Sequence, residues 1–132
     1  MPIAALSLAV VGAAHSNKKG APTRAFAIQL CRPGDTVELV PEPKNPADPH
    51  AVMVLNREGM QMGYLTAERA PWIGGMLGQG REIRAVFQEP TSYGAVIRVA
   101  FDGEEPALPA PRERETANRE VDFYPDEIYP DE

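Results

Sequence analysis

A proline-rich segment lies between two runs of residues that have the composition of β-strands. Residues 42–52 contain prolines at positions 43, 46 and 49, each of which fixes φ and lacks a backbone donor. Proline also pushes the preceding residue towards extended geometry, and Asn45 and Asp48 can bond to nearby backbone groups in turns. The segment is therefore expected to be a rigid loop that presents one carboxylate and one amide at fixed angles, as a binding loop on a scaffold does.

Apolar residues that alternate along the rest of the chain predict short strands. The expected strands fall within residues 3–14, 36–40, 51–55, 60–65, 83–87 and 95–101. Two short helices are expected, one over residues 24–31 with Thr23 as its N-cap, and one that Thr66 caps and that ends near Leu77. These elements predict a mainly β protein built on a small, partly closed six-stranded β-barrel. An open sheet with helices on one face is the structural alternative.

The spacing of apolar residues in the two helices predicts which side chains face the core. Phe26 and Leu30 share one face of the first helix. In the second helix, the core-facing residues are expected to be Ala70, Ile73 and Leu77. Trp72 is also expected to pack in the core, because a large aromatic ring gains most from burial.

Charge is distributed unevenly along the chain. The net charge is −6, from 19 acidic and 13 basic side chains. Residues 1–105 carry 11 acidic and 10 basic side chains, a net of −1, whereas residues 106–132 carry 8 and 3, a net of −5. A nearly neutral body excludes a strongly basic nucleic-acid binder, but it leaves room for a weaker or end-specific one.

The acidic residues at the C-terminal end are expected to form a tail that follows a single domain. A chain of 132 residues has the size of one domain, here residues 1–105. Proline and charge predict that residues 106–132 are a flexible, solvated tail, in which Tyr-Pro-Asp-Glu occurs at 124–127 and again at 129–132. Docking of this tail on the body or on a partner is the alternative, because Phe123 and Ile128 are unusual in a purely solvating segment.

The sequence lacks the residues that most metal and cofactor sites require. Cys31 is the only cysteine, which excludes an internal disulfide and a cysteine-based zinc site and fits a reducing, cytoplasmic location. We expect Cys31 to be a small buried hydrophobe, with a reactive thiol as the alternative. The two histidines, His15 and His50, belong to no paired ligand motif. No metal and no cofactor is therefore expected.

Motifs of known catalytic machinery are also missing. The chain has no Gly-x-x-x-x-Gly-Lys-[Ser/Thr] phosphate loop and no Gly-x-Ser-x-Gly elbow. We therefore expect a protein that is not an enzyme. A hydrolytic site around Asp48 and His50 is the alternative.

The apolar run over residues 3–14 has two membrane-related interpretations, and both are disfavoured. No Lys or Arg precedes the run, although a signal peptide needs a basic start. The run is also shorter than the about 20 residues that cross a bilayer. It is expected to be a buried strand, and no membrane partner is expected.

Three motifs follow one another along the chain in a characteristic order. They are Val10-Val11-Gly12, then Gly34-Asp35-x-Val37-x-Leu39-Val40-Pro41-Glu42-Pro43-x-Asn45-Pro46-x-Asp48-x-x-Ala51-Val52-x-Val54, and then Gly63-Tyr64-Leu65 before a helix. Together they resemble the HIRAN domain, from about residue 6 to about residue 101. The resemblance implies a barrel similar to the OB-fold. The ATP hydrolysis of helicase-like relatives is not expected of this chain, because the phosphate loop is absent.

The resemblance also implies the residues of a DNA-end site. Characterised HIRAN domains bind the free 3′ end of single-stranded DNA. A loop carboxylate accepts a hydrogen bond from the terminal hydroxyl, and aromatic rings stack on the last bases. Carried over, Asp48 reads the hydroxyl, Asn45 braces the loop, and His15 and Tyr64 contact bases or sugar. An ionised carboxylate only accepts hydrogen bonds, so it suits a hydroxyl and repels a terminal phosphate.

Three positions depart from the pattern of DNA-binding relatives. Ala47 stands where relatives often carry an aromatic residue, and Ala14 and His15 stand where they carry Arg and Tyr. Contacts to phosphates are then expected from other basic side chains. The candidates are Lys18, Lys19, Lys44 and Arg69.

The sequence thus predicts a stand-alone HIRAN protein that binds single-stranded DNA at a free 3′-hydroxyl end, with DNA repair as its setting. The expected partners are single-stranded DNA and, as a further candidate, a helicase or repair protein. The alternative is a protein-interaction or adaptor module whose acidic tail recruits a partner.

Overall fold

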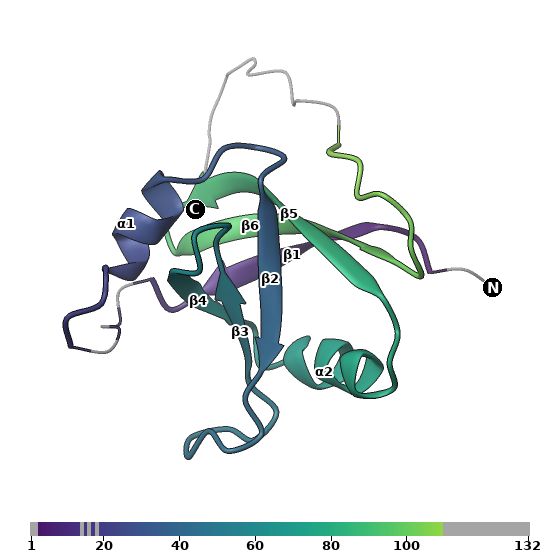
Figure 1. The fold of residues 1–132 in the computed structure, drawn as a ribbon, viewed down its shortest axis with the longest axis horizontal. Coiled ribbons are helices and arrows are strands. Elements are labelled where there is room, and N and C mark those ends of the chain that lie inside the picture. Colours follow the sequence, from purple (N-terminus) through teal and green to yellow (C-terminus); the bar gives the residue numbers. More distant parts are fainter. Residues whose placement is uncertain (1–2, 14, 16, 18, 110–132) are drawn as a thin grey trace.

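The computed structural model describes residues 3–13, 15, 17 and 19–109, and its strands close on themselves (Figure 1). Every neighbouring pair is antiparallel, in the order β1-β4-β3-β2-β5-β6, and β6 pairs back with β1. In chain order the elements are β1 (Leu6–Val11), α1 (Arg24–Gln29), β2 (Thr36–Pro41), β3 (Val52–Leu55), β4 (Gln61–Leu65), α2 (Ala70–Gly78), β5 (Ile83–Thr91) and β6 (Gly94–Phe101). The predicted mainly β barrel with two short helices is confirmed, and the open sheet is excluded.

Side chains that alternate along the strands fill the barrel, as the period of a strand requires. Val52 and Val54 are fully buried, while Met53 between them lies on the outer face and is only half-buried. Gly63 pairs with Val54, and a Cβ at Gly63 would overlap the carbonyl oxygen of Val11. A glycine at this position therefore lets β4 approach β1 closely enough to close the barrel.

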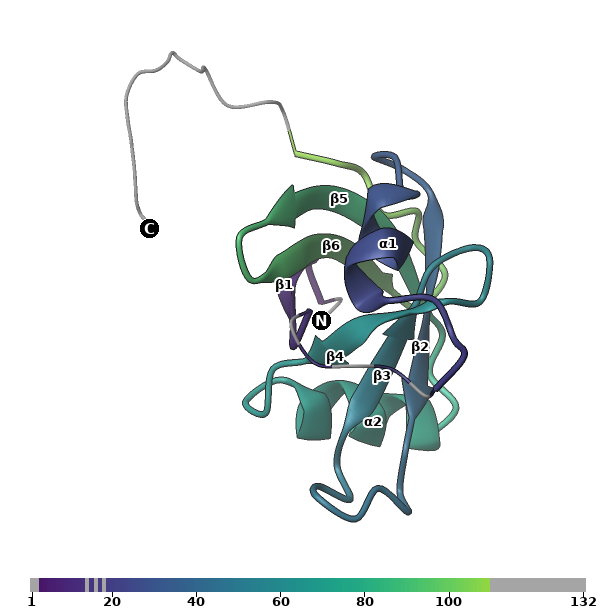
Figure 2. The same cartoon turned by 90° about the vertical axis from the view of Figure 1, so that its left-hand side faces the viewer.

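The first helix lies at one end of the barrel, and α2 lies at the opposite end (Figures 1 and 2). Thr23 caps α1 as predicted, since its Oγ1 accepts from the backbone N–H of Phe26 at 3.0 Å. The predicted apolar face is wrong, because Phe26 is 46% and Leu30 is 43% exposed. The helix instead buries Ala27 and Ile28 on the side that packs against β4.

The second helix begins later than the capping motif predicts. Thr66 starts a turn, in which its carbonyl accepts from the N–H groups of Arg69 and Ala70, so α2 begins only at Ala70. Trp72 is not a core residue, since it is 37% exposed and lies tilted against Phe101 with ring centroids 5.7 Å apart. Ile73 is fully buried and carries the core contact of this helix.

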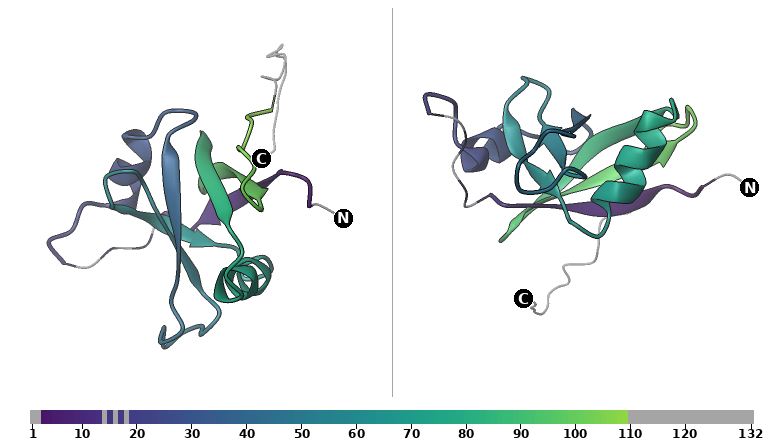
Figure 3. Two further views of the ribbon diagram at one scale, coloured as in Figure 1. Left: turned by 45° about the vertical axis from the view of Figure 1, so that its right-hand side comes forward. Right: turned by 90° about the horizontal axis from the view of Figure 1, so that it is seen from below.

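Two connections position the surface of the barrel. The β2–β3 loop projects beyond the barrel on the side of α2 (Figures 1 and 3). The strands β5 and β6 extend beyond the predicted ranges 83–87 and 95–101, because Thr91 still pairs with Gly94 and only Ser92 and Tyr93 form the turn.

The segment after β6 remains in contact with the barrel. Arg98 donates to the carbonyl oxygen of Ala107 at 3.2 Å, and Arg84 forms an ion pair with Glu105. The predicted boundary at residue 105 thus falls within a stretch that still touches the body. Residues 110–132, which hold most of the predicted tail, lie outside the described residues. Within the described ranges, no helix is long and apolar enough to cross a membrane.

Candidate nucleic-acid interface

The β2–β3 loop is held at its base by backbone hydrogen bonds. The N–H of Glu42 donates to the carbonyl of Ala51 at 2.9 Å, and the N–H of Ala51 donates to the carbonyl of Asp48 at 3.1 Å. The N–H of Asn45 donates to the carbonyl of Glu42 at 3.0 Å. Successive turns therefore fold the loop back on itself. None of these hydrogen bonds requires a backbone N–H at a proline position.

Two side chains bond to the loop backbone from within. Asn45 Oδ1 accepts from the N–H groups of Ala47 and Asp48 at 2.8 and 3.1 Å. Asp48 Oδ1 accepts from the N–H of His50 at 2.8 Å. Both are Asx-type contacts, in which a short polar side chain mimics a backbone acceptor. One oxygen of Asp48 is thus used within the loop, and no described residue donates to Oδ2.

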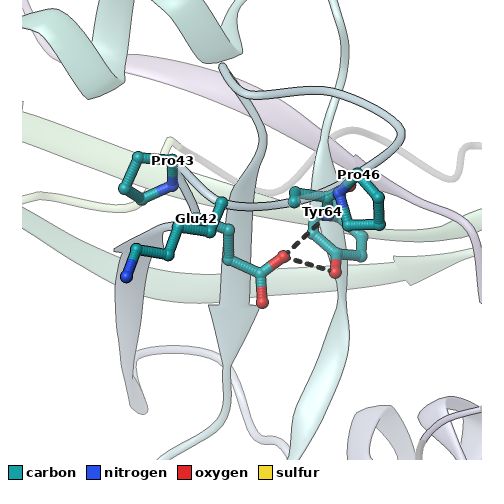
Figure 4. Close-up of a pocket in the computed structure, with 6 residues that line it drawn as sticks. Glu42, Pro43, Pro46 and Tyr64 are labelled. Carbon is teal, nitrogen blue, oxygen red and sulfur yellow. Dashed lines mark hydrogen bonds between the residues drawn. The ribbon is translucent and has the colours of Figure 1, made fainter.

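A pocket of about 560 Å³ lies between this loop and β4 (Figure 4). Its lining combines two proline rings, one tyrosine ring, one amide, one carboxylate and one amine: Pro43, Pro46, Tyr64, Asn45, Glu42 and Lys44. Such a mixture of apolar walls with a few polar groups is typical of small-ligand sites.

One carboxylate joins the loop to β4. Glu42 Oε1 accepts from the hydroxyl of Tyr64 at 2.7 Å and from Nδ2 of Asn45 at 2.9 Å (Figure 4). Burial raises the pKa of Tyr64, and the hydrogen bond and charge of Glu42 raise it further, against smaller opposing effects of Gln61 and Arg24. The Tyr64 hydroxyl therefore stays protonated and donates to Glu42 over the physiological pH range.

A buried guanidinium supports the Tyr64 ring. Arg24 is only 8% exposed, and its guanidinium carbon lies 5.4 Å from the ring centroid of Tyr64, within the range of a cation–π contact. Its Nε donates to Asn17 Oδ1 at 2.7 Å and its Nη1 to the carbonyl of Gly12 at 2.8 Å. Gly12 has φ +87°, and a Cβ there would lie 3.0 Å from Arg24 Nη1, so glycine accommodates the guanidinium.

The structure brings part of the predicted site together. Asn45, Lys44 and Tyr64 line the pocket. Asp48 belongs to the same loop and is half-buried, but it is not part of the pocket lining. The binding roles of these residues remain predictions.

The other predicted residues lie elsewhere. His15 is exposed in the loop after β1, where its backbone N–H donates to the carbonyl of Gly12 at 3.0 Å. Lys19 is exposed, and Lys18 lies outside the described residues. Arg69 is placed over the ring of Trp72, with 5.8 Å between the guanidinium carbon and the ring centroid, and does not line the pocket.

Sequence reasoning assigned no role to Glu42 or Arg24. Glu42 opens the Glu-Pro-x-Asn-Pro run, but its contact with Tyr64 spans 22 residues and cannot be read from spacing. Arg24 carried a weak signal, because a cation in the first turn of a helix opposes the helix dipole and so suggests a compensating contact.

Among the residues that the structure describes, no group of three or more His, Cys, Asp or Glu side chains could hold a metal ion.

Comparisons with known proteins agree with the barrel fold. The fold is similar to the crystal structure of the HIRAN domain of human HLTF, with a TM-score of 0.59 and 23% identity over 74% of each chain. It is also similar to the crystal structure of a protein from Lactobacillus plantarum, with a TM-score of 0.57 and 18% identity over 74% of this chain and 97% of that one. No curated protein matches the sequence. The HIRAN domain family profile matches residues 4–94, and the chain belongs to the HIRAN domain family.

Proposed function

We propose that this chain is a nucleic-acid-binding module that takes the free 3′-hydroxyl end of single-stranded DNA at the β2–β3 loop and Tyr64. Membership of the HIRAN family supports nucleic-acid binding in general. The observation that carries the proposal is the pocket itself, which lies between the Asn-Pro-x-Asp loop and the one aromatic ring of its lining. The proposed activity is binding rather than catalysis.

The chemistry of the pocket suits a nucleoside better than a phosphate. Proline and tyrosine rings offer flat apolar surfaces on which a base can stack, and stacking on an aromatic ring is worth about 1–3 kcal/mol per base. Glu42 would repel a phosphate at the pocket, whereas it can accept a hydrogen bond from a hydroxyl or amine. The exposed amine of Lys44 at the rim can pair with the phosphate that precedes the last sugar.

Asp48 is proposed to accept from the terminal hydroxyl through Oδ2, while Oδ1 keeps its contact with the N–H of His50. This division of roles gives the loop a fixed shape before the ligand arrives. A preorganised loop loses little entropy on binding.

The test compares two fluorescent DNA strands that differ only in having a 3′ hydroxyl or a 3′ phosphate. Anisotropy at low salt should show tighter binding of the hydroxyl strand by the wild type. Asp48→Asn keeps an oxygen for the N–H of His50 but removes the charge, so it should reduce the preference for hydroxyl over phosphate. Glu104→Gln serves as a control with the same charge change on the exposed segment after β6.

Equal affinity for both ends in the wild type would rule out end recognition. If Asp48→Asn kept the preference for a 3′ hydroxyl over a 3′ phosphate, another residue would have to recognise the hydroxyl. Absence of binding to either strand would reject nucleic-acid binding altogether.

A protein-interaction module is the second candidate, and the outer face of α1 favours it. Phe26 on this helix and Leu30 at its C-cap are four residues apart, and both are more than 40% exposed. A helicase or repair protein is the class of partner that helicase-linked relatives suggest. Salt separates the two candidates, because DNA binding weakens steeply with salt through counterion release and an apolar interface does not.

A further inference from the structure

We propose that Glu42 reads the edge of the terminal base, so that the pocket prefers a 3′-terminal guanine and disfavours thymine. This inference rests on the proposed function, and it adds base selectivity to end recognition. It follows from the orientation of one carboxylate, the walls around it, and the donors that each base presents.

The carboxylate of Glu42 is oriented before any ligand binds. Two donors, the Tyr64 hydroxyl and the Asn45 amide, both engage Oε1. No donor among the described residues engages Oε2. The half-buried side chain thus presents one free acceptor oxygen at a pocket it helps to line (Figure 4).

The pocket has the shape and the walls for a base. A volume of about 560 Å³ exceeds that of a single base and leaves space for the sugar. Pro43 and Pro46 supply apolar surface beside the carboxylate. A base stacked against these rings would direct its polar edge towards Glu42, because the edge would otherwise lose its hydrogen bonds with water.

The four bases differ in what they offer to a lone acceptor oxygen. Guanine presents two adjacent donors, N1–H and the N2 amine, which can share one carboxylate oxygen. Cytosine and adenine each present one exocyclic amine. Thymine presents a single N–H between two carbonyl oxygens, and these carbonyls repel the carboxylate. The expected order of affinity is guanine first, then cytosine and adenine, and thymine last.

The probes are four labelled strands with the same thymine tract and a free 3′ hydroxyl, which differ only in the last base. Anisotropy on the full chain should show the strand ending in dG bound roughly three- to tenfold more tightly than the strand ending in dT, the range expected for one net hydrogen bond. Glu42→Gln should bring the two affinities within about twofold of each other, because an amide can donate to the carbonyls of thymine as well as accept.

Glu38→Gln is the matched control. It makes the same change on β2, where Glu38 is exposed and lies outside the pocket lining, so it should keep the full preference. Circular dichroism of each variant confirms that the barrel is intact before affinities are compared.

The outcomes separate the two proposals. Equal binding of all four strands by the wild type, with hydroxyl preferred over phosphate, overturns base reading and leaves end recognition standing. A preference for guanine that persists in Glu42→Gln also overturns the role of Glu42. Failure of every strand to bind overturns both proposals together.

Discussion

Tyr64 and Glu42 form the central pair of the pocket, and the state of the tyrosine reports on that pair. Burial first, and then the hydrogen bond and charge of Glu42, raise the pKa of Tyr64. Glu42→Gln removes the charge and weakens the hydrogen bond, so the pKa of Tyr64 should fall towards its ordinary value while the part due to burial remains. An ultraviolet titration of tyrosinate measures this shift.

The chain has four tyrosines, so the signal must be assigned. Subtracting the titration of Tyr64→Phe isolates Tyr64 in each background. If Glu42→Gln left the tyrosine titration unchanged, the Glu42 contact would not hold in solution, and the basis for reading a base edge through Glu42 would disappear with it.

Cys31 illustrates how burial decides the chemistry of a single residue. Burial, together with the negative charge of Asp35, raises the pKa of its thiol to about 11. The thiol also contacts the carbonyl of Ala27 and the sulfur of Met62, at 3.4 and 3.9 Å. The half-buried position is closer to the expected small hydrophobe than to a reactive thiol.

Alkylation with iodoacetamide tests this state of Cys31, because only the thiolate reacts. With a pKa two units above its ordinary value, the folded protein should react about a hundredfold more slowly at pH 8 than the same chain in guanidinium. The rate in the folded protein should keep rising up to about pH 11. A plateau near pH 9 would show an unperturbed thiol.

At the scale of elements, Asn56 connects the β3–β4 turn to α1. It is 3% exposed, and its Nδ2 donates to the carbonyl of Ala27 at 3.0 Å. Its Oδ1 accepts from the N–H groups of Glu58 and Met60 at 2.9 and 3.0 Å. One side chain therefore satisfies three buried or half-buried backbone groups on two elements.

Replacing Asn56 with alanine should lower the free energy of unfolding by about 2–4 kcal/mol, because backbone groups are left without partners inside the protein. Urea denaturation followed by circular dichroism measures the change. Gln29→Ala, at an exposed position on α1, is the control and should shift it by less than about 0.5 kcal/mol. If the free energy of unfolding fell as little in Asn56→Ala as in the control, water would be replacing the hydrogen bonds of the Asn56 side chain.

The strands could be predicted from sequence, whereas the helix faces could not. Alternation along a strand has a period of two, so one buried residue such as Val54 sets the direction of its neighbours. In α1, the spacing of apolar residues placed Phe26 on the buried face. The face that is actually buried includes Arg24 instead. That choice depends on a hydrogen bond to Gly12 in another part of the chain, which no local pattern encodes.

The candidate site was predictable to the same extent. The bracing contacts of Asn45 are local and follow from turn chemistry. The contact of Glu42 with Tyr64 joins the β2–β3 loop to β4, 22 residues further along the chain, so it could be seen only in the folded structure. Sequence thus located the loop, and tertiary contacts showed which of its side chains face the pocket.

At the scale of the whole molecule, the distribution of charge bears on affinity. Residues 1–105 are nearly neutral, with a net charge of −1. Residues 110–132 contain all 8 acidic and 3 basic side chains that follow residue 105, a net of −5. An anionic segment tethered to a DNA-binding surface repels the DNA or competes with it, and either effect is strongest when salt is low.

Truncation after Pro109 should therefore strengthen binding of single-stranded DNA severalfold at low salt, and the gain should shrink as salt shortens the Debye length from about 30 Å at 0.01 M to about 8 Å at 0.15 M. The cut at this point keeps the contacts of Arg84 and Arg98 with residues 105 and 107, so the unfolding midpoint should not change.

A second variant, in which the acidic residues after Pro109 are replaced by Asn and Gln without truncation, separates the effect of charge from that of specific contacts. Affinity equal to that of the truncated chain would assign the effect to charge, whereas affinity equal to that of the wild type would assign it to the apolar and tyrosine side chains. Unchanged affinity after truncation at low salt would show that the acidic segment does not regulate DNA binding.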